Sequence, residues 1–354
     1  MSDLKFALIG CGRVSHKHAE AIANVPGARL VGVCDVDIAR ANAIAQPLGI
    51  PAFADMDEMI SSVPEIDIVE ILTPSGHHAQ HVIRMARHKK HIVVEKPMAL
   101  RLDDADEMIT ACDRAGVRLF VVKQNRCNPP VRRLREAIDA DRFGKLVMGT
   151  ARVRWCRRQD YYDLDAWRGT SALDGGVLAN QASHYVDLLV WLFGPVESVV
   201  AMTATRLVKI ETEDTAAVLL RFANGALGIV EATTATRPTD LEGSLSVLGE
   251  RGAVVIGGFA VNQLQTWNFE TSMPSDDDVV VDSTASGGGV YGAGHRVLLD
   301  NVVRTIRGQA SPLVDGRDGR RSLEVIDAIY RSVESGREVK LAYHSRKSAS
   351  TANG

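Results

Sequence analysis

The 354-residue sequence has few aromatic residues, no long apolar run and no large excess of either charge. No apolar run reaches the roughly 20 residues that a membrane-spanning helix needs, and the N-terminus shows no signal-peptide cleavage pattern. The formal net charge of −3 is unlike the concentrated basic face of a nucleic-acid-binding protein. We therefore expect a cytoplasmic protein with neither a membrane nor a nucleic-acid partner.

The sequence also lacks the features of a metal site. Its five cysteines are scattered without CxxC spacing, and an odd number in an intracellular chain indicates reduced thiols packed in the fold. His77 and His81 have the spacing i, i+4 of ligands on a helix, but no third ligand of matching kind is evident. We therefore expect no bound metal.

Strand and helix patterns alternate through the first 123 residues. Runs rich in Val and Ile, each followed by a helical pattern, predict a parallel sheet covered on both faces, which is the doubly wound Rossmann arrangement. The expected strands are 4–10, 29–35, 66–74, 91–97 and 117–122, and the expected helices begin near Ser15 or cover 38–49, 77–90 and 102–116.

From residue 124 the pattern changes to longer strand-like runs joined by short turns, including the hairpin signal Asn224-Gly225. We expect a second α/β domain over 124–344, with a large, mostly antiparallel sheet that is open on one face. Helices are expected over 128–140 and near 182–193, 295–307 and 319–335. The small, polar tail over 345–354 is expected to be disordered.

The stretch GCGRVS, which begins at Gly10, lies between the first expected strand and its helix. Gly10 would permit a tight turn, and Gly12 would let a pyrophosphate approach the backbone at the positive helix N-terminus. Ser15 stands where a third glycine is usual; it is small enough for close packing and could cap the helix. Asp35 would bind both ribose hydroxyls and repel a 2′-phosphate, which favours NAD over NADP. The alternative is an ordinary turn, with Asp35 as a helix cap.

Lys96 in VVEKP stands at the carboxyl end of an expected parallel strand, the edge where ligands of open α/β sheets bind. A lysine there could hydrogen-bond a substrate hydroxyl or stabilise an alkoxide, although it could equally be a surface residue.

Asn180, His184 and Asp187 share one face of the helix expected near 182–193, and apolar residues bury its other side. A lone histidine at a helix start is more often structural than catalytic. The pair Gly175-Gly176 just upstream favours a site, because it would allow a ligand to approach the backbone.

Five arginines, two tryptophans and two tyrosines are concentrated between Arg152 and Arg168. Guanidinium groups pair with carboxylates and phosphates, and aromatic faces suit a base or a sugar ring, so the segment predicts an anionic substrate. The alternative is a solvated strand end and loop, with Arg152 and Arg154 alternating outward.

The chain resembles the glucose–fructose oxidoreductase and inositol dehydrogenase (Gfo/Idh/MocA) family of NAD(P)-dependent sugar oxidoreductases over nearly its whole length. The matching segments are GCGRVS, TPSGHHAQHV, VVEKP, WRGT, GGVLANQASHYVDLLVWLFG and the C-terminal stretch from Gly294 to Val339. The resemblance implies a homo-oligomer of four or more subunits and a Lys96–His184 pair at the nicotinamide.

The resemblance also implies two sets of binding residues. Cofactor contacts are expected from Gly10, Gly12, Arg13, Val14, Asp35, Thr73, Pro74, His78, Glu95, Lys96, Trp167 and Arg168. Substrate contacts are expected from Lys96, Arg154, Arg157, Arg158, Tyr161, Asn180, Gln181 and His184.

Asn180 stands where many members carry an Asp four residues before the histidine. With VKQNRCNPPV and YYDLDAWRGT, it resembles the branch that oxidises the C3 hydroxyl of UDP-N-acetylglucosaminuronic acid on the route to diacetamido-uronic acid sugars of bacterial surface polysaccharide (O-antigen). We expect His184 to be the general base and Lys96 to be the hydrogen-bond donor that orients the substrate hydroxyl and offsets alkoxide charge, and the reverse assignment stays open. The alternatives are an inositol or other neutral-sugar dehydrogenase, or a non-catalytic nucleotide sensor, against which Lys96 and His184 argue.

Overall fold

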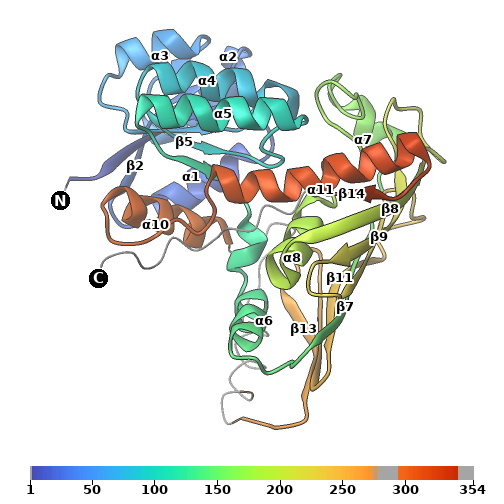
Figure 1. Ribbon diagram of the computed structural model, residues 1–354. Helices are drawn as coiled ribbons and strands as arrows, with labels where there is room; N and C mark the ends of the chain where they lie inside the picture. Colours follow the sequence, from blue (N-terminus) through green and yellow to red (C-terminus); the bar gives the residue numbers. More distant parts are fainter. Residues whose placement is uncertain (1, 274–275, 277–293, 342–354) are drawn as a thin grey trace.

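The computed structural model of the protein describes residues 2–273, 276 and 294–341 (Figure 1). The expected disordered tail over 345–354 lies outside these residues. Two sheets, one of six strands and one of eight, organise the molecule. Among the described helices, none has the length and apolar character needed to cross a membrane.

The first sheet is entirely parallel, as the sequence predicts. Its strands are β1 (Leu4–Ile9), β2 (Ala28–Cys34), β3 (Ala52–Phe53), β4 (Ile68–Ile71), β5 (His91–Val94) and β6 (Leu119–Val121). The order β3-β2-β1-β4-β5-β6 changes direction between β1 and β4, so the crevice at their carboxyl ends is the expected ligand site of this fold.

Helices cover both faces of this sheet. They are α1 (Ser15–Ala23), α2 (Ile38–Leu48), α3 (Met56–Ser62), α4 (His78–Arg87) and α5 (Leu102–Ala115), with the 3-10 turns η1 (Ser75–His77) and η2 (Gln124–Cys127). Figure 1 shows α3, α4 and α5 stacked on one side of the sheet. The short elements β3 and α3 were not predicted, because two and seven residues give too little periodicity to read.

The second sheet has the order β13-β12-β11-β7-β10-β9-β8-β14. Its strands are β7 (Leu146–Arg154), β8 (Val196–Ala204), β9 (Thr215–Phe222), β10 (Leu227–Thr233), β11 (Glu242–Gly249), β12 (Gly252–Gly257), β13 (Gln263–Phe269) and β14 (Val339–Lys340). All neighbours are antiparallel except β7 and β10, which confirms a large, mostly antiparallel sheet. The strands β13 and β14 were not predicted.

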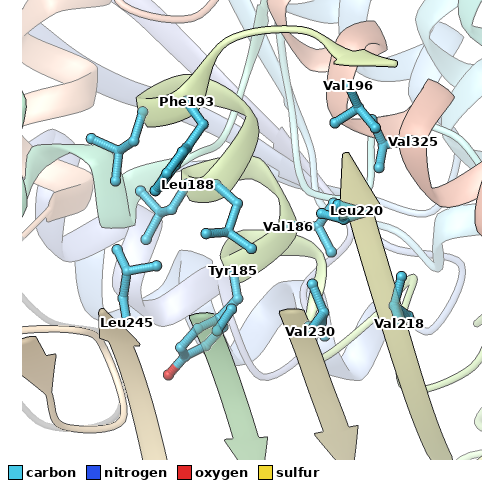
Figure 2. Close-up of a cluster of buried hydrophobic side chains, with 14 of the residues drawn as sticks. Tyr185, Val186, Leu188, Phe193, Val196, Val218, Leu220, Val230, Leu245 and Val325 are labelled. Carbon is cyan, nitrogen blue, oxygen red and sulfur yellow. The ribbon is translucent and has the colours of Figure 1, made fainter. Parts of the chain in front are cut away.

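The helix α8 (Ser183–Phe193) packs on the inner face of the second sheet (Figure 2). Tyr185, Leu188 and Phe193 reach between side chains of β9, β10 and β11, such as Leu220 and Leu245. The opposite side of α8 is also buried, including His184 and Asp187. Polar side chains on this helix are therefore held in a largely dry environment.

Four further helices lie among the described residues. They are α6 (Pro129–Asp139), α7 (Gln159–Asp163), α10 (Gly294–Ile306) and α11 (Gly316–Ser335). The helix α11 contacts α5 and β6 on one side and α8 and β8 on the other, and Figure 1 shows it running between the two halves. The helix α10 packs on α1 and adds Leu299 and Val302 to the core of the first sheet. A domain division at residue 123 stays a prediction, and two late segments, α10 and the first part of α11, pack with the first sheet.

Candidate active site

The turn after β1 is closed on one side and open on the other. Gly10 has φ +99°, and a Cβ there would lie 2.7 Å from the carbonyl carbon of Leu72, so only glycine fits. A Cβ on Gly12 would meet none of the described atoms within 4 Å. The backbone beside Gly12 can therefore be approached by a phosphate at the N-terminus of α1.

Ser15 is fully buried and is the first residue of α1. Its hydroxyl donates a hydrogen bond to the carbonyl oxygen of Gly12. The small side chain thus permits close packing, but the suggestion that Ser15 caps the helix is wrong, because its hydroxyl points back into the turn. The hydroxyl takes up none of the amide N–H groups of the first turn, where those of Ser15 and Lys17 donate to the carbonyl oxygens of Gly12 and Val14.

Asp35 closes the same turn from the end of β2. Its carboxylate accepts hydrogen bonds from the backbone N–H of Cys11 at 2.7 Å and of Asp37 at 2.9 Å. The cap of α2 is Asp37, which accepts from the N–H of Ala39, so Asp35 is not a helix cap. Each oxygen of Asp35 keeps a lone pair for a ribose hydroxyl, and these residues fit NAD.

Other expected cofactor residues lie around this crevice. Arg13 is exposed and Val14 precedes α1. His78 is buried, and its two ring nitrogens lie 2.8 Å from the carbonyl oxygens of Pro97 and Thr73. His78 therefore joins the turns after β4 and β5, and a direct contact between His78 and the cofactor stays a prediction.

Lys96 reaches from the end of β5 to the second half of the molecule. Its Nζ donates to the backbone oxygen of Asn180 at 3.1 Å and to Oδ1 of the same residue at 3.2 Å. Burial lowers the pKa of Lys96, while the carboxylates of Glu95 and Asp174 oppose that shift. The structure thus brings together two residues that are 84 positions apart in the sequence.

Asn180 links Lys96 to a carboxylate that sequence analysis missed. The Asn180 amide donates to Asp174, which also accepts from the backbone N–H of Gly169 at 2.7 Å. Burial raises the pKa of the Asp174 carboxyl. A carboxylate is therefore linked to Lys96 even though position 180 is an Asn. The link runs from Lys96 to the side-chain amide of Asn180, and from that amide to Asp174.

His184 is buried at the start of α8. Its Nε2 lies 3.3 Å from the side-chain nitrogen of Gln124, and its Nδ1 has no hydrogen-bond partner among the described residues. Burial, and then the charges of Lys96 and Lys123, lower the pKa of His184 well below its ordinary value. The imidazole is therefore neutral near pH 7, as a proton acceptor must be. Gln181, an expected substrate contact, is buried one turn earlier.

A buried ion pair lies beside His184. Arg126 donates to both oxygens of Asp187 at 2.7 Å, and Nζ of Lys123 lies 3.7 Å from the same carboxylate. Burial lowers the pKa of Lys123 and Asp187 opposes that shift. Neither Lys123 nor Arg126 was predicted as a site residue, although the polar run KQNR at the end of a parallel strand was a usable signal.

The pair Gly175-Gly176 has a role in packing. A Cβ on Gly176 would lie 1.8 Å from a carboxylate oxygen of Glu213, whose other oxygen accepts from the N–H of Leu178 and the hydroxyl of Tyr330, both at 3.0 Å. The Glu213 side chain therefore requires glycine at 176, as the Ala179 side chain does at 175, and the approach of a ligand to this pair stays a prediction.

Arg154 is not placed to bind a ligand near His184. It lies on β7 between inward-facing residues, so it projects from the face of the sheet opposite α8. Its guanidinium binds Glu231 at 2.6 and 2.7 Å and Glu242 at 3.0 Å. The predicted substrate contact of Arg154 is therefore corrected, and the outward alternation of Arg152 and Arg154 holds.

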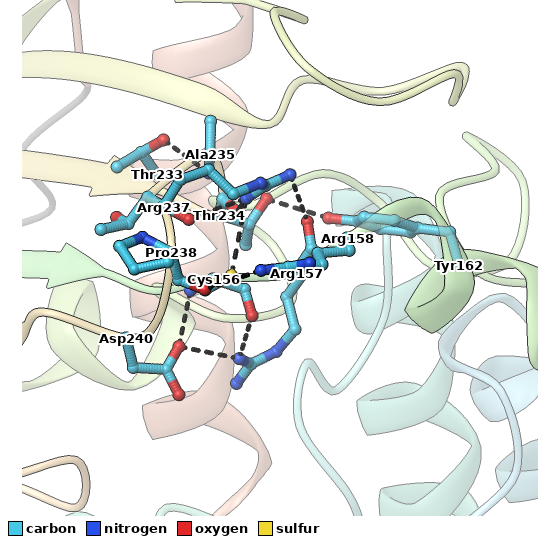
Figure 3. A network of polar contacts seen from close by, with 11 residues as sticks. Cys156, Arg157, Arg158, Tyr162, Thr233, Thr234, Ala235, Arg237, Pro238 and Asp240 are labelled. Atoms are coloured by element: carbon cyan, nitrogen blue, oxygen red, sulfur yellow. Dashed lines mark hydrogen bonds and ion pairs between the residues drawn. The ribbon is translucent and has the colours of Figure 1, made fainter.

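Arg157 and Arg158 lie in the polar network of Figure 3. Arg157 donates to Asp240 at 3.0 Å and lies over the rings of Trp155 and Tyr161, with its central carbon 5.3 and 5.4 Å from the ring centroids. Arg158 is exposed and donates to the carbonyl oxygen of Pro238 at 3.2 Å. Both directly precede α7, which carries Tyr161 and Tyr162.

Arg168 lies between the rings of Tyr161 and Trp167, 4.6 Å from each centroid. It donates to Asp165 at 3.0 Å, and the other oxygen of Asp165 lies 3.6 Å from Arg40 on α2. The segment around Trp167 and Arg168 therefore reaches across to the nucleotide end of the first sheet, which is the position expected of a cofactor contact.

Family models match both halves of the chain. The model described as the NAD-binding Rossmann fold of an oxidoreductase family (GFO_IDH_MocA) matches residues 4–123, and its C-terminal alpha/beta domain matches residues 135–341.

Two solved structures and a myo-inositol 2-dehydrogenase are similar to the chain over most of its length. The WlbA dehydrogenases of Bordetella pertussis and Chromobacterium violaceum, each in complex with NADH and UDP-GlcNAcA, are both 43% identical. They match over 97% of this chain and 99% and 97% of theirs, with TM-scores of 0.89 and 0.91. A myo-inositol 2-dehydrogenase of Thermotoga maritima is 27% identical over 96% of this chain and 98% of its own.

Proposed function

The chain belongs to the Gfo/Idh/MocA oxidoreductase family, and from this premise we propose that it oxidises the C3 hydroxyl of UDP-N-acetylglucosaminuronic acid with NAD. Membership confirms the predicted family, the NAD-binding Rossmann domain and the coarser function of an NAD-dependent sugar or polyol dehydrogenase. The finer substrate is supported by the 43% identity to proteins crystallised with UDP-GlcNAcA, compared with 27% to the inositol dehydrogenase.

The observation that carries the proposed chemistry is the neutral, buried His184 near the ammonium of Lys96. His184 Nδ1 has no partner among the described residues, and the lowered pKa of His184 keeps the imidazole unprotonated. Lys96 is held toward Asn180 at the junction of the two halves. A proton acceptor and a cationic donor in one dry site suit the removal of a hydroxyl proton.

NAD, when bound, accepts the hydride from the carbon that is oxidised. Gly12 and the first turn of α1 would hold its pyrophosphate, and Asp35 would hold its ribose. His184 takes the proton of the C3 hydroxyl, while Lys96 donates a hydrogen bond to the same oxygen and offsets the negative charge that develops on it. In the reverse assignment Lys96 takes the proton, which requires a much larger fall in its pKa.

Arg157 and Arg158 are the proposed contacts for the anionic groups of the substrate. Arg157 is rigidly supported between aromatic rings, and Arg158 is exposed with a backbone carbonyl as its partner. A uronic acid linked to a diphosphate offers three anionic groups for such guanidinium donors. A neutral polyol offers these arginines no anionic group.

The open face of the second sheet supports the proposed homo-oligomer. Met202, Leu219 and Leu227 lie on neighbouring strands and are 78%, 58% and 42% exposed. Adjacent exposed apolar side chains of this kind mark contact surfaces. Replacing Met202 and Leu219 with Glu should convert the assembly to smaller species in light scattering, and an unchanged mass would refute the use of this face.

The test of the proposed function follows absorbance at 340 nm with NAD and three substrates. UDP-GlcNAcA should be oxidised, UDP-GlcNAc, which lacks the carboxylate, should react poorly, and myo-inositol should not react. The 3-keto product would identify the oxidised carbon by mass spectrometry after reduction with borodeuteride. Faster oxidation of myo-inositol than of UDP-GlcNAcA would support the neutral-sugar alternative, and no NADH from any substrate would support the non-catalytic one.

A further inference from the structure

Four titratable side chains that the proposed mechanism does not use are buried behind Lys96. They are His18 on α1, Glu70 on β4, Glu95 after β5 and His295 on α10. The His18 ring is fully buried, and the ring of His295 packs edge-on against it, 5.0 Å away. Burying so many ionisable groups is costly unless their charges are paired.

Both nitrogens of His18 face carboxylates. Nδ1 lies 2.5 Å from Glu70, and Nε2 lies 3.1 Å from Oε1 of Glu95. A carboxylate oxygen faces each ring nitrogen, and an ionised carboxylate only accepts hydrogen bonds, so the arrangement favours a proton on both nitrogens and an imidazolium ring. Burial alone would lower the pKa of His18, but the two carboxylates raise it to about 10.

Glu95 contacts both His18 and Lys96. Its Oε1 binds His18, while its Oε2 accepts a hydrogen bond from the backbone N–H of Lys96 at 2.8 Å. His295 approaches the same Oε1, with Nε2 at 3.8 Å. Although burial would raise the pKa of Glu95, the hydrogen bond from His18 holds it well below its ordinary value.

We propose that His18 is a positioning residue for Lys96. Through Glu95 it fixes the main chain of Lys96 and keeps a negative charge beside the lysine ammonium. His18 lies one turn after Ser15, so the helix that begins at the expected phosphate site also holds the lysine turn in place. The functional meaning of this link rests on the proposed role of Lys96, but the link itself can be measured without turnover.

A metal ion is the competing occupant of the same cluster. His18, Glu95 and His295 offer donor atoms within 4.8 Å of one another. An imidazolium has no lone pair to give a metal, and His18 has a carboxylate acceptor at each nitrogen. The hydrogen-bonded arrangement therefore favours a proton over a metal, and metal analysis of the purified protein separates the two.

The expected electrostatic effect has a definite sign. Glu95 and Asp174 raise the pKa of Lys96 against the effect of burial, and the charged or titratable groups of Lys123 and His184 also lie near it. Without the His18 imidazolium, Glu95 loses the strongest of the interactions that oppose burial, so the pKa of its carboxyl rises. A less firmly held negative charge beside Lys96 supports its ammonium less, so the pKa of Lys96 should fall.

The experiment is competitive acetylation of the full-length protein with trace acetic anhydride from pH 6 to 11, read by mass spectrometry of the peptide that holds Lys96. In His18→Gln the midpoint for Lys96 should fall by about 1 pH unit relative to the wild type. His88→Gln is the matched control, because His88 pairs with Asp57 at 3.0 Å on the surface, and its midpoint should be that of the wild type.

An unchanged Lys96 midpoint in folded His18→Gln would overturn the proposal, as would one equivalent of metal per chain. If His18→Gln does not fold, Glu95→Gln keeps the shape of the turn and removes the charge, and it must show the same fall. Failure of the proposed function is distinguishable, because it would appear as absent oxidation of UDP-GlcNAcA by a wild-type protein whose Lys96 titrates as expected.

Discussion

The ion pair of Asp187 and Arg126 can be tested by Asp187→Asn. Asp187 is 1% exposed, its two oxygens accept hydrogen bonds of 2.7 Å from Arg126, and Lys123 lies 3.7 Å away. The substitution keeps the shape of the side chain but leaves two buried cations without their counter-charge. Removing one partner of a buried pair costs about 3–5 kcal/mol, so we expect a loss of that size in the free energy of unfolding.

The matched control is Asp139→Asn, which removes an exposed carboxylate from Arg135 on α6. An exposed pair contributes at most about 1 kcal/mol, so this variant should unfold almost as the wild type does. Urea unfolding followed by circular dichroism measures both variants, and the difference in midpoint at equal slope gives the difference in stability.

Asp187→Asn should also weaken the proposed base. Asp187 raises the pKa of His184, against burial and the charges of Lys96 and Lys123. Its loss should lower that pKa further and reduce kcat at neutral pH. Stabilities of Asp187→Asn and Asp139→Asn that agree within about 1 kcal/mol would refute the reasoning, because they would mean that the buried pair is no more costly to break than an exposed one.

Three further predictions concern catalysis. His184→Asn should abolish NADH formation while the Kd of NADH, measured by fluorescence, stays near the wild-type value; retained turnover would exclude His184 as the base. Because burial lowers the pKa of His184, kcat/KM should stay high as pH falls to 6.5 and decline only at more acid pH. A decline centred at or above pH 6.5 would contradict the lowered pKa of this buried imidazole. Arg157→Ala and Arg158→Ala should each raise the KM for UDP-GlcNAcA about tenfold or more, as expected for the loss of a charge-assisted hydrogen bond. Arg154→Ala should leave this KM unchanged, because Arg154 projects from the other face of the sheet. Equal effects of all three substitutions would contradict this assignment.

The nucleotide end of the molecule was largely predictable because its signals are local. Gly10, Gly12 and Asp35 stand at fixed positions relative to β1, α1 and β2, and strand–turn–helix geometry is set by neighbouring residues. Ser15 shows the limit of such reasoning. Its small size was read correctly, but only the structure shows that its hydroxyl binds the turn behind it rather than capping the helix.

The junction was less predictable because its side chains meet across long distances in the chain. The run KQNR was visible as polar residues at a strand end, yet its partner Asp187 is 61 positions from Arg126. The glycines at 175 and 176 suggested a ligand, but Glu213 comes from another part of the second half. Arg154 carried the charge expected of a substrate contact, and two glutamates from other strands neutralise it.

By itself the sequence determined the alternation of strands and helices, the glycine turn with its acidic partner at Asp35, and the presence of Lys96 and His184 at element ends. These follow from periodicity and from the conformational needs of short segments. Only the tertiary structure decided which charges are paired. His18 contacts Glu70, 52 residues away in the sequence, and Glu95, 77 residues away. Such pairs form because a charge that is buried away from water is costly unless an opposite charge or a hydrogen-bond partner lies beside it.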